Sequence, residues 1–203
     1  MFITPPEPKT SRKIAEMYRN AEKTYGYLPN MYRTFGHRPE VMESWSALLV
    51  SLRGNIEPRR YELVTLAAAR ELRSSYCMLA HAAVLAREGV SNDELEHIVA
   101  NAEDAPLDEQ ERAIMIFAAK VVRDATLITQ ADINALKSHA LTDAEIFDIV
   151  AAASARCFFS KTLDALGTSP DQAYVDKLGP QLAEKLALGR PIEREPETVG
   201  ATL

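Results

Sequence analysis

The chain has 203 residues, of which 47% are hydrophobic and 26% charged, and a formal net charge of -6 at pH 7. These proportions are those of a soluble globular protein and exclude disordered, collagen-like and disulfide-framework classes. The acidic balance argues against a dedicated nucleic-acid-binding protein, because phosphate contacts need clustered Lys and Arg. No apolar run reaches roughly 18 residues, and the start MFITPPEPKT lacks the basic and apolar regions of a signal peptide. We therefore expect one compact domain in the cytoplasm, without membrane contact.

The N-terminal part of the chain predicts a series of helices. Apolar residues recur at helical spacing over residues 11–25, and Gly26 follows as a helix stop. Residues 27–38 contain a proline, a glycine and several aromatic residues, which favours a short helical turn packed on a hydrophobic surface. Pro39 then opens a further helix that Gly54 ends.

The central stretch ELVTLAAARELRSSYCMLAH predicts two helices with a break between them. Pro58 begins the first helix, which runs toward Leu72 through small residues that allow close packing. Ser74 is a favourable N-cap residue, so we expect a break near Arg73 and a second helix that lasts until Gly89.

The remaining sequence continues as helices, and we find no convincing period-2 strand. Residues 168–179 look like a loop, residues 180–188 predict one more short helix, and residues 190–203 are charged, proline-bearing and expected to be loose. Capping boxes precede the apolar stripes at Ser91 with Glu94, Asp108 with Glu111, Thr142 with Glu145 and, in a weaker form, Thr129 with Asp132. The fold class is therefore all-α.

Four reactive side chains in the central stretch form a candidate catalytic site. Cys77 lies three residues after Ser74 and four before His81, so one helix would place all three on one face. A helix N-terminus favours the thiolate, the form in which cysteine acts as a nucleophile. His81 could take the thiol proton or stabilise the thiolate, and Glu62 on the preceding helix could orient His81. The alternative is structural, because a lone Cys in an Ala-rich helix is often a buried packing residue.

The same residues resemble a known family, the alkylhydroperoxidase D and carboxymuconolactone decarboxylase family. Its redox-active members carry a Glu, then C-x-x-C twelve residues on, then a His four after the second Cys. Glu62, Ser74, Cys77 and His81 fall on those spacings. The flanking segments GYLPNMYRTFGHRPEVMESW and FFSKTLDALGTSPD resemble the longer, peroxidase-related branch of that family.

The resemblance implies the alkylhydroperoxidase D-like helical fold and a homo-oligomer. It divides the chain into an N-terminal helical segment (1–56), the alkylhydroperoxidase D-like core (57–170) and a partly loose C-terminal extension (171–203). It also implies reduction of hydroperoxides through Cys77, with no metal or organic cofactor. In the redox-active relatives the second cysteine is the one that resembles the peroxide-attacking thiol, and the carboxylate and imidazole relay its proton.

Ser74 is the departure from that pattern. A hydroxyl stands where the relatives have the first cysteine, so this chain cannot form the intramolecular C-x-x-C disulfide. A sulfenate on Cys77 would need an external thiol, Cys157 or a cysteine of another subunit to reduce it. We expect Ser74 to cap the helix and donate a hydrogen bond to the thiolate.

Two other functions remain open from the sequence. One is a decarboxylase-like lyase in which His81 and Glu62 act as acid and base on a lactone acid, without a redox cysteine. The other is a non-catalytic helical oligomer. Cys157 is interpreted as a packing residue, Tyr76 as a pocket residue, and Arg59 and Arg60 as solvated or paired across subunits.

Overall fold

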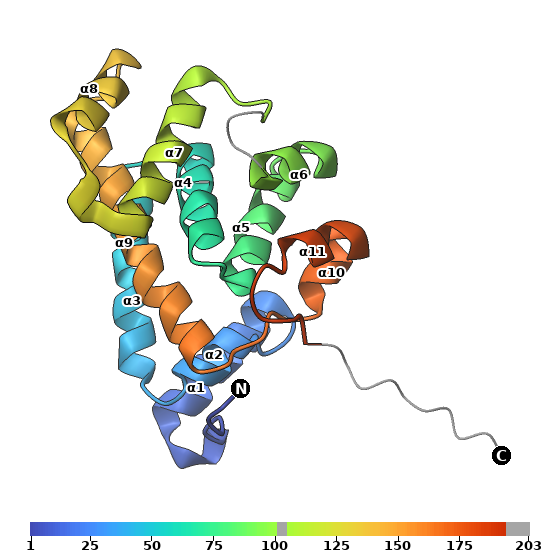
Figure 1. The fold of residues 1–203 in the computed structure, drawn as a ribbon. Coiled ribbons are helices and arrows are strands. Elements are labelled where there is room, and N and C mark those ends of the chain that lie inside the picture. The colour runs from blue at the N-terminus through green and yellow to red at the C-terminus, as the bar shows by residue number, and fades with distance from the viewer. Residues whose placement is uncertain (101–104, 194–203) are drawn as a thin grey trace.

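The computed structural model describes residues 1–100 and 105–193, which form eleven α-helices and two short 3-10 helices without a strand (Figure 1). The all-α prediction is therefore confirmed. The elements are η1 (Pro8–Thr10), α1 (Arg12–Tyr25), α2 (Asn30–Phe35), α3 (Pro39–Arg53), α4 (Pro58–Glu71), α5 (Ser75–Arg87), α6 (Asn92–Ala100), α7 (Glu109–Asp124), η2 (Ala125–Leu127), α8 (Gln130–Ser138), α9 (Asp143–Ala165), α10 (Ala173–Leu178) and α11 (Pro180–Leu186).

Local signals set most of the helix ends. Gly26 ends α1 in the left-handed conformation, at φ 82°, where glycine avoids the steric cost that a Cβ atom brings. The capping boxes of α7 and α9 form as predicted, with Asp108 and Thr142 accepting from the backbone of Glu111 and Glu145.

The loop predicted for residues 168–179 is wrong in its second half, where α10 forms. Turn residues in the segment favour a loop, but Tyr174 and Leu178 are buried. They lie on a helix that packs against α5 and α11. Burial of these two side chains is a tertiary effect that outweighs the local preference.

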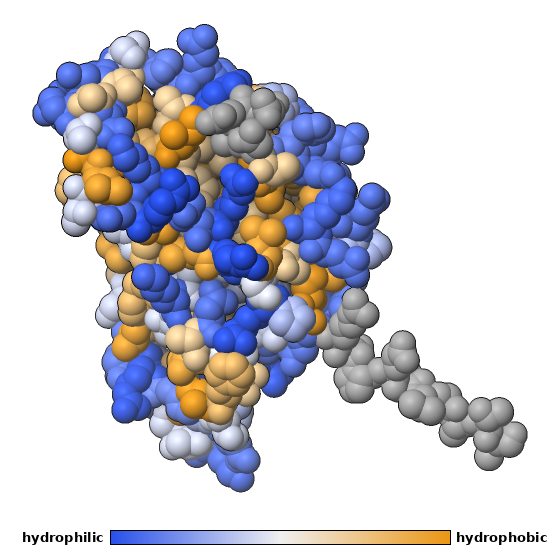
Figure 2. Space-filling model, viewed as in Figure 1, coloured by the Kyte–Doolittle hydropathy of each residue, from blue (hydrophilic) through white to orange (hydrophobic). Residues whose placement is uncertain are grey.

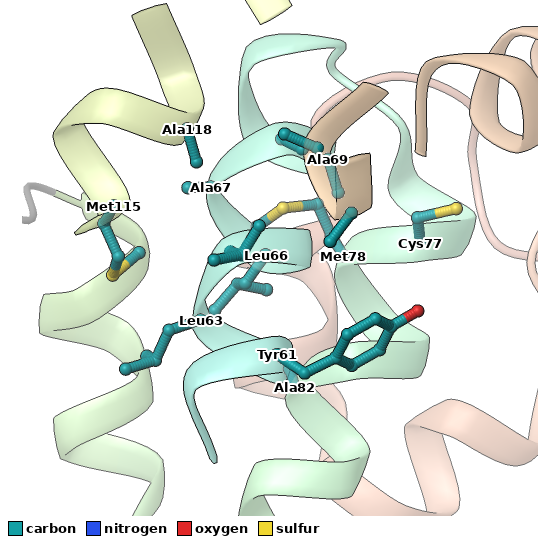
Figure 3. Packing of buried hydrophobic residues seen from close by; sticks show 14 of the residues in the cluster. Tyr61, Leu63, Leu66, Ala67, Ala69, Cys77, Met78, Ala82, Met115 and Ala118 are labelled. Carbon is teal, nitrogen blue, oxygen red and sulfur yellow. The ribbon is translucent and has the colours of Figure 1, made fainter. Parts of the chain in front are cut away.

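Helix α4 lies at the centre of the core and packs against α5, α7 and α9. Its middle is buried on every side, and the small residues Ala67, Ala68 and Ala69 let the neighbouring helices approach closely. In the close-up, Leu66 and Met78 fill the space between α4 and its neighbours (Figure 3). A helix that is apolar all round is expected to be a core helix.

The segment after α11 crosses the junction between α4 and α5. Gly189 N donates to Ser75 Oγ at 2.8 Å, and Arg73 donates to the carbonyl of Leu188 at 3.0 Å. A Cβ atom on Gly189 would lie 2.1 Å from the carbonyl oxygen of Arg73, so only glycine fits. The C-terminal stretch predicted to be loose is thus fixed as far as Glu193, whose N–H donates to Pro170; its residues 194–203 lie outside the described part.

Hydrophilic residues cover most of the face seen in Figure 2, around smaller hydrophobic areas. Within residues 1–100 and 105–193, every helix is too short or too polar to cross a membrane.

Candidate active site

The break between α4 and α5 sets the position of Cys77. Arg73 adopts a left-handed conformation (φ 55°), and Ser74 is extended at the N-cap position of α5. Cys77 therefore lies in the first turn of α5, as predicted. In Figure 3 its side chain and the hydroxyl of Tyr61 point to the same side, away from Met115 and Ala118.

Two side chains of α9 approach the sulfur of Cys77. Ser160 Oγ lies 3.1 Å from Cys77 Sγ as a hydrogen-bond donor, and a guanidinium nitrogen of Arg156 lies at 3.8 Å. A hydroxyl donor and a cation both stabilise a thiolate more than a thiol. The sulfur thus has a hydroxyl donor and a cation as neighbours.

Arg156 is a buried cation without a carboxylate partner in the part of the chain that the structure describes. Its side chain is 4% exposed, its second terminal nitrogen donates to Tyr61 Oη at 3.2 Å, and its Nε has no hydrogen-bond partner. The guanidinium also lies over the rings of Trp45 and Phe159, at 5.6 Å from each centroid. Burial lowers the pKa of Arg156, but Cys77 and Tyr61 outweigh it and the net pKa is raised. A buried charge is costly unless polar groups surround it, and the groups that the two terminal nitrogens contact are the Cys77 sulfur and the Tyr61 hydroxyl.

His81, four residues after Cys77 on α5, and Glu62 form a buried pair. His81 Nδ1 lies 2.5 Å from one oxygen of Glu62, and Arg53 donates to the other oxygen at 2.6 Å. Burial raises the pKa of Glu62, but His81 and Arg53 outweigh it and the net pKa is lowered. Burial and Arg156 lower the pKa of His81, against the opposing effect of Glu62. The pair is therefore a carboxylate and a neutral imidazole whose Nδ1–H donates to Glu62, so Nε2 is free to accept a proton.

The protonation of His81 predicts how stability depends on pH. Since folding lowers the pKa of His81, the unfolded chain binds more protons as the pH falls through the ordinary histidine value of about 6.5. We expect the melting temperature to decrease from pH 8 to pH 5.5, and His81→Asn to reduce that slope. His97→Asn, at an exposed histidine, is the control. Equal slopes in calorimetry for wild type and His81→Asn would contradict this account.

Cys77 and His81 both line a cavity of about 780 Å³ between α2, α3, α5, α9 and α10. Tyr76 lines it too, as predicted, and its hydroxyl donates to Asp171 at 2.6 Å. A volume of this size is typical of a site for an organic small molecule. Among the described residues, no three His, Cys, Asp or Glu side chains are placed to hold a metal ion.

Ser74 does not do what was predicted of it. It occupies the N-cap position of α5, but its side chain makes no capping hydrogen bond. It lies instead beside the carboxyl of Asp164, where it opposes the rise in the pKa of that group that burial causes. The donors to Cys77 come instead from Arg156 and Ser160 of α9.

Arg59 and Arg60 were predicted to be solvated or paired across subunits, and the structure shows neither. Both pair within the chain: Arg59 with Glu111 at 2.5 Å and Arg60 with Glu145 at 2.7 Å. Their charges are thereby neutralised at the starts of α7 and α9.

Cys157 is not among the cavity-lining residues. It is half-buried, and its thiol donates to the carbonyl of Ala153 at 3.6 Å. Burial raises the pKa of this thiol, so at neutral pH Cys157 is protonated, and the protonated thiol is less reactive than the thiolate.

Arg156 and Ser160 are residues of the candidate site that the sequence analysis missed. They are four residues apart on α9, so they share one face of it. That face also carries Ala152, Ala153 and Leu163, which are buried. An arginine on the apolar face of a helix is the signal that could have identified them, because such a position is costly unless the charge has a role.

A sequence model described as the carboxymuconolactone decarboxylase family matches residues 39–120, a range that contains Glu62, Ser74, Cys77 and His81. No curated protein sequence matches the chain.

Several solved structures share the fold. A peroxidase-related protein from Ralstonia eutropha with an alkylhydroperoxidase AhpD core has 23% identity and a TM-score of 0.77, covering 85% of this chain and 93% of its own. A peroxidase-related protein from Silicibacter sp. has 22% identity and a TM-score of 0.75, covering 88% and 100%. A variant of the debrominase Bmp8 in complex with 2,3,4-tribromopyrrole has 15% identity and a TM-score of 0.71, covering 88% and 96%. Residues 39–120 thus match the carboxymuconolactone decarboxylase family, and the solved structures and the helical architecture show that the chain has the alkylhydroperoxidase D-like fold.

Proposed function

We propose that this protein is a thiol-dependent peroxidase that reduces organic hydroperoxides through Cys77. The observation that carries the proposal is the contact of the Cys77 sulfur with Ser160 and the buried Arg156 at the wall of a cavity. A packing cysteine has no need of a buried cation, whereas a nucleophilic thiolate is stabilised by one.

In the proposed mechanism, His81 moves the proton. Nε2 of the neutral imidazole takes the proton of the Cys77 thiol, while Glu62 holds the ring through Nδ1–H and stabilises the cation that forms. The thiolate attacks the distal oxygen of the hydroperoxide, an S–O bond forms and the O–O bond breaks. His81 then gives its proton to the leaving alkoxide. The sulfur is oxidised to sulfenic acid and the hydroperoxide is reduced to an alcohol.

The second half of the cycle needs two electrons from outside the chain. Two external thiols would reduce the sulfenic acid to the thiol, with formation of one disulfide and one water. Because Cys77 is 1% exposed and faces the cavity, we infer that the reductant is a small thiol that can enter it. Cys157 does not line the cavity, which argues against it as the resolving cysteine. Assembly as a homo-oligomer in the cytoplasm stays part of the proposal.

Trapping of the sulfenic acid tests the proposal directly. The protein is treated with a small excess of cumene hydroperoxide in the presence of a dimedone probe, and the adduct is mapped by mass spectrometry. We expect modification of Cys77 and not of Cys157, because only the former is beside Ser160 and Arg156. The proposal fails if the peroxide is not consumed and Cys77 carries no adduct.

The acid-base alternative is supported by the same pair of residues. A buried carboxylate that orients a neutral imidazole toward a cavity is also the arrangement of a general base. In that reaction His81 would act on a carboxy-substituted lactone and Cys77 would be dispensable, so substitutions at the two positions separate the functions.

A further inference from the structure

The cavity beside Cys77 has a charge opposite to that of the whole protein. The chain has 29 acidic and 23 basic residues, yet the cavity is lined by Arg53, Arg87, Arg156 and Lys177 and by no Asp or Glu. A concave site lined by charges of one sign concentrates ligands of the other sign. The cavity therefore favours an anion.

The walls of the cavity are aromatic. Six of the seven tyrosines of the chain and its single tryptophan, Trp45, line it. Walls of this kind bind an extended apolar or aromatic body through burial and ring contacts. A volume of about 780 Å³ also far exceeds the space of roughly 30 Å³ that one water molecule takes, so hydrogen peroxide would leave nearly all of it unused.

Helix α5 gives the cavity a direction. Cys77, Ala80, His81, Val84 and Arg87 all line it, at the spacing of one helix face. Ten residues of helix correspond to about 15 Å, so the cavity extends over roughly that distance from the sulfur to Arg87. Cys77 is buried and Arg87 is exposed, so the sulfur lies at the inner end and Arg87 at the mouth.

The mouth holds two cations, Arg87 and Lys177, that have no ion-pair partner among the described residues. In residues 1–100 and 105–193, neither Arg87 nor Lys177 makes an ion pair; Lys177 lies over the ring of Tyr174, with Nζ 5.7 Å from the centroid. Arg53 is already paired with Glu62, and Arg156 with the sulfur and Tyr61. Arg87 and Lys177 are thus the cations that remain available to a ligand.

We propose that the cavity binds amphipathic carboxylates: the carboxylate pairs with Arg87 and Lys177, the apolar body packs on the aromatic walls, and a hydroperoxide group on that body lies at Cys77. Binding of the carboxylate does not depend on the peroxidase function proposed above, whereas the placement of a hydroperoxide group at Cys77 rests on that function. It assigns the substrate class as a hydroperoxide of a long-chain or aryl-substituted carboxylic acid.

Binding of an unreactive ligand tests the ligand class without any peroxide. Dodecanoate and dodecanol are titrated separately at low salt, with Trp45 fluorescence and calorimetry as readouts. We expect dodecanoate to bind at least about tenfold more tightly, as one additional charged contact allows. We expect 0.5 M salt to reduce that preference, since exposed charges are screened.

The double variant Arg87→Gln/Lys177→Gln should remove the preference for dodecanoate, whereas Lys13→Gln, at an exposed lysine of α1 outside the cavity, should keep it. Equal affinities for the two ligands, or no binding of either by both readouts, would overturn the inference. A preference that survives the double variant would overturn the assignment to Arg87 and Lys177.

A kinetic comparison links the ligand class to the reaction. Linoleic acid hydroperoxide should oxidise Cys77 at least about tenfold faster than its methyl ester, which lacks the charge. Equal rates for acid and ester would sink the substrate assignment and leave the peroxidase function standing. If neither these two nor cumene hydroperoxide oxidises Cys77, the peroxidase function fails, and the binding experiment still decides the ligand class.

Discussion

Replacement of Cys77 by Ser is expected to reduce the reduction of cumene hydroperoxide by about 1000-fold or more, to the rate of the external thiol alone. A hydroxyl is a far weaker nucleophile at neutral pH, and loss of the attacking group removes the step on which the others depend. The measurement is the consumption of peroxide with dithiothreitol as the reductant. Cys157→Ser is the matched control and should retain activity, because Cys157 does not line the cavity.

His81→Ala measured in the same assay separates the peroxidase from the lyase. In the peroxidase the imidazole assists proton transfer, so we expect a loss of about 100-fold and residual activity from the thiolate that Arg156 stabilises. A lyase acting on a carboxy-substituted lactone would instead keep full activity in Cys77→Ser and lose all activity in His81→Ala. If that result is found and the wild-type protein consumes no peroxide, the peroxidase proposal fails and the lyase function takes its place.

Replacement of Arg156 by Met is expected to slow the alkylation of Cys77 by iodoacetamide at pH 7 by about 10- to 150-fold. The guanidinium contact favours the thiolate, and a hydrogen bond to a charged group is worth about 1.5–3 kcal/mol, which corresponds to that range of thiolate populations. Ser160→Ala should act in the same direction with a smaller effect, because a hydroxyl carries no charge. Arg123→Met, at an exposed ion pair with Glu71, is the control and should leave the rate unchanged.

The stability of Arg156→Met distinguishes this role from a structural one. Met can pack between Trp45 and Phe159 in place of the guanidinium, and the buried charge disappears with its desolvation cost. The melting temperature should therefore stay within about 4 °C of wild type, the shift that corresponds to about 1 kcal/mol in a chain of this length. A large destabilisation with an unchanged alkylation rate would show that Arg156 serves packing instead.

The helices and their ends were largely available from the sequence. Pro39, Pro58, Gly26 and the capping boxes act on the backbone within a few residues of themselves, so their effect does not depend on the rest of the fold. The prediction at α10 was wrong because this helix depends on the rest of the fold. Tyr174 is buried there, and α10 packs against α5.

The candidate site divides in the same way. The spacing of Cys77 and His81 determined by itself that they share a face of one helix, and the N-cap preference of Ser74 predicted that Cys77 lies in its first turn. The contact of His81 with Glu62 could be named as an expectation, because the two helices are consecutive, but its 2.5 Å distance needed the structure.

Only the tertiary structure decided which groups act on the sulfur and what the cavity can hold. Arg156 and Ser160 are about eighty residues from Cys77 along the chain and reach it through the packing of α9 against α5. Ser74, three residues away, was expected to donate and does not, since its hydroxyl lies beside the carboxyl of Asp164 on α9. Sequence spacing fixes contacts within one helix, whereas contacts between helices depend on how the whole core packs.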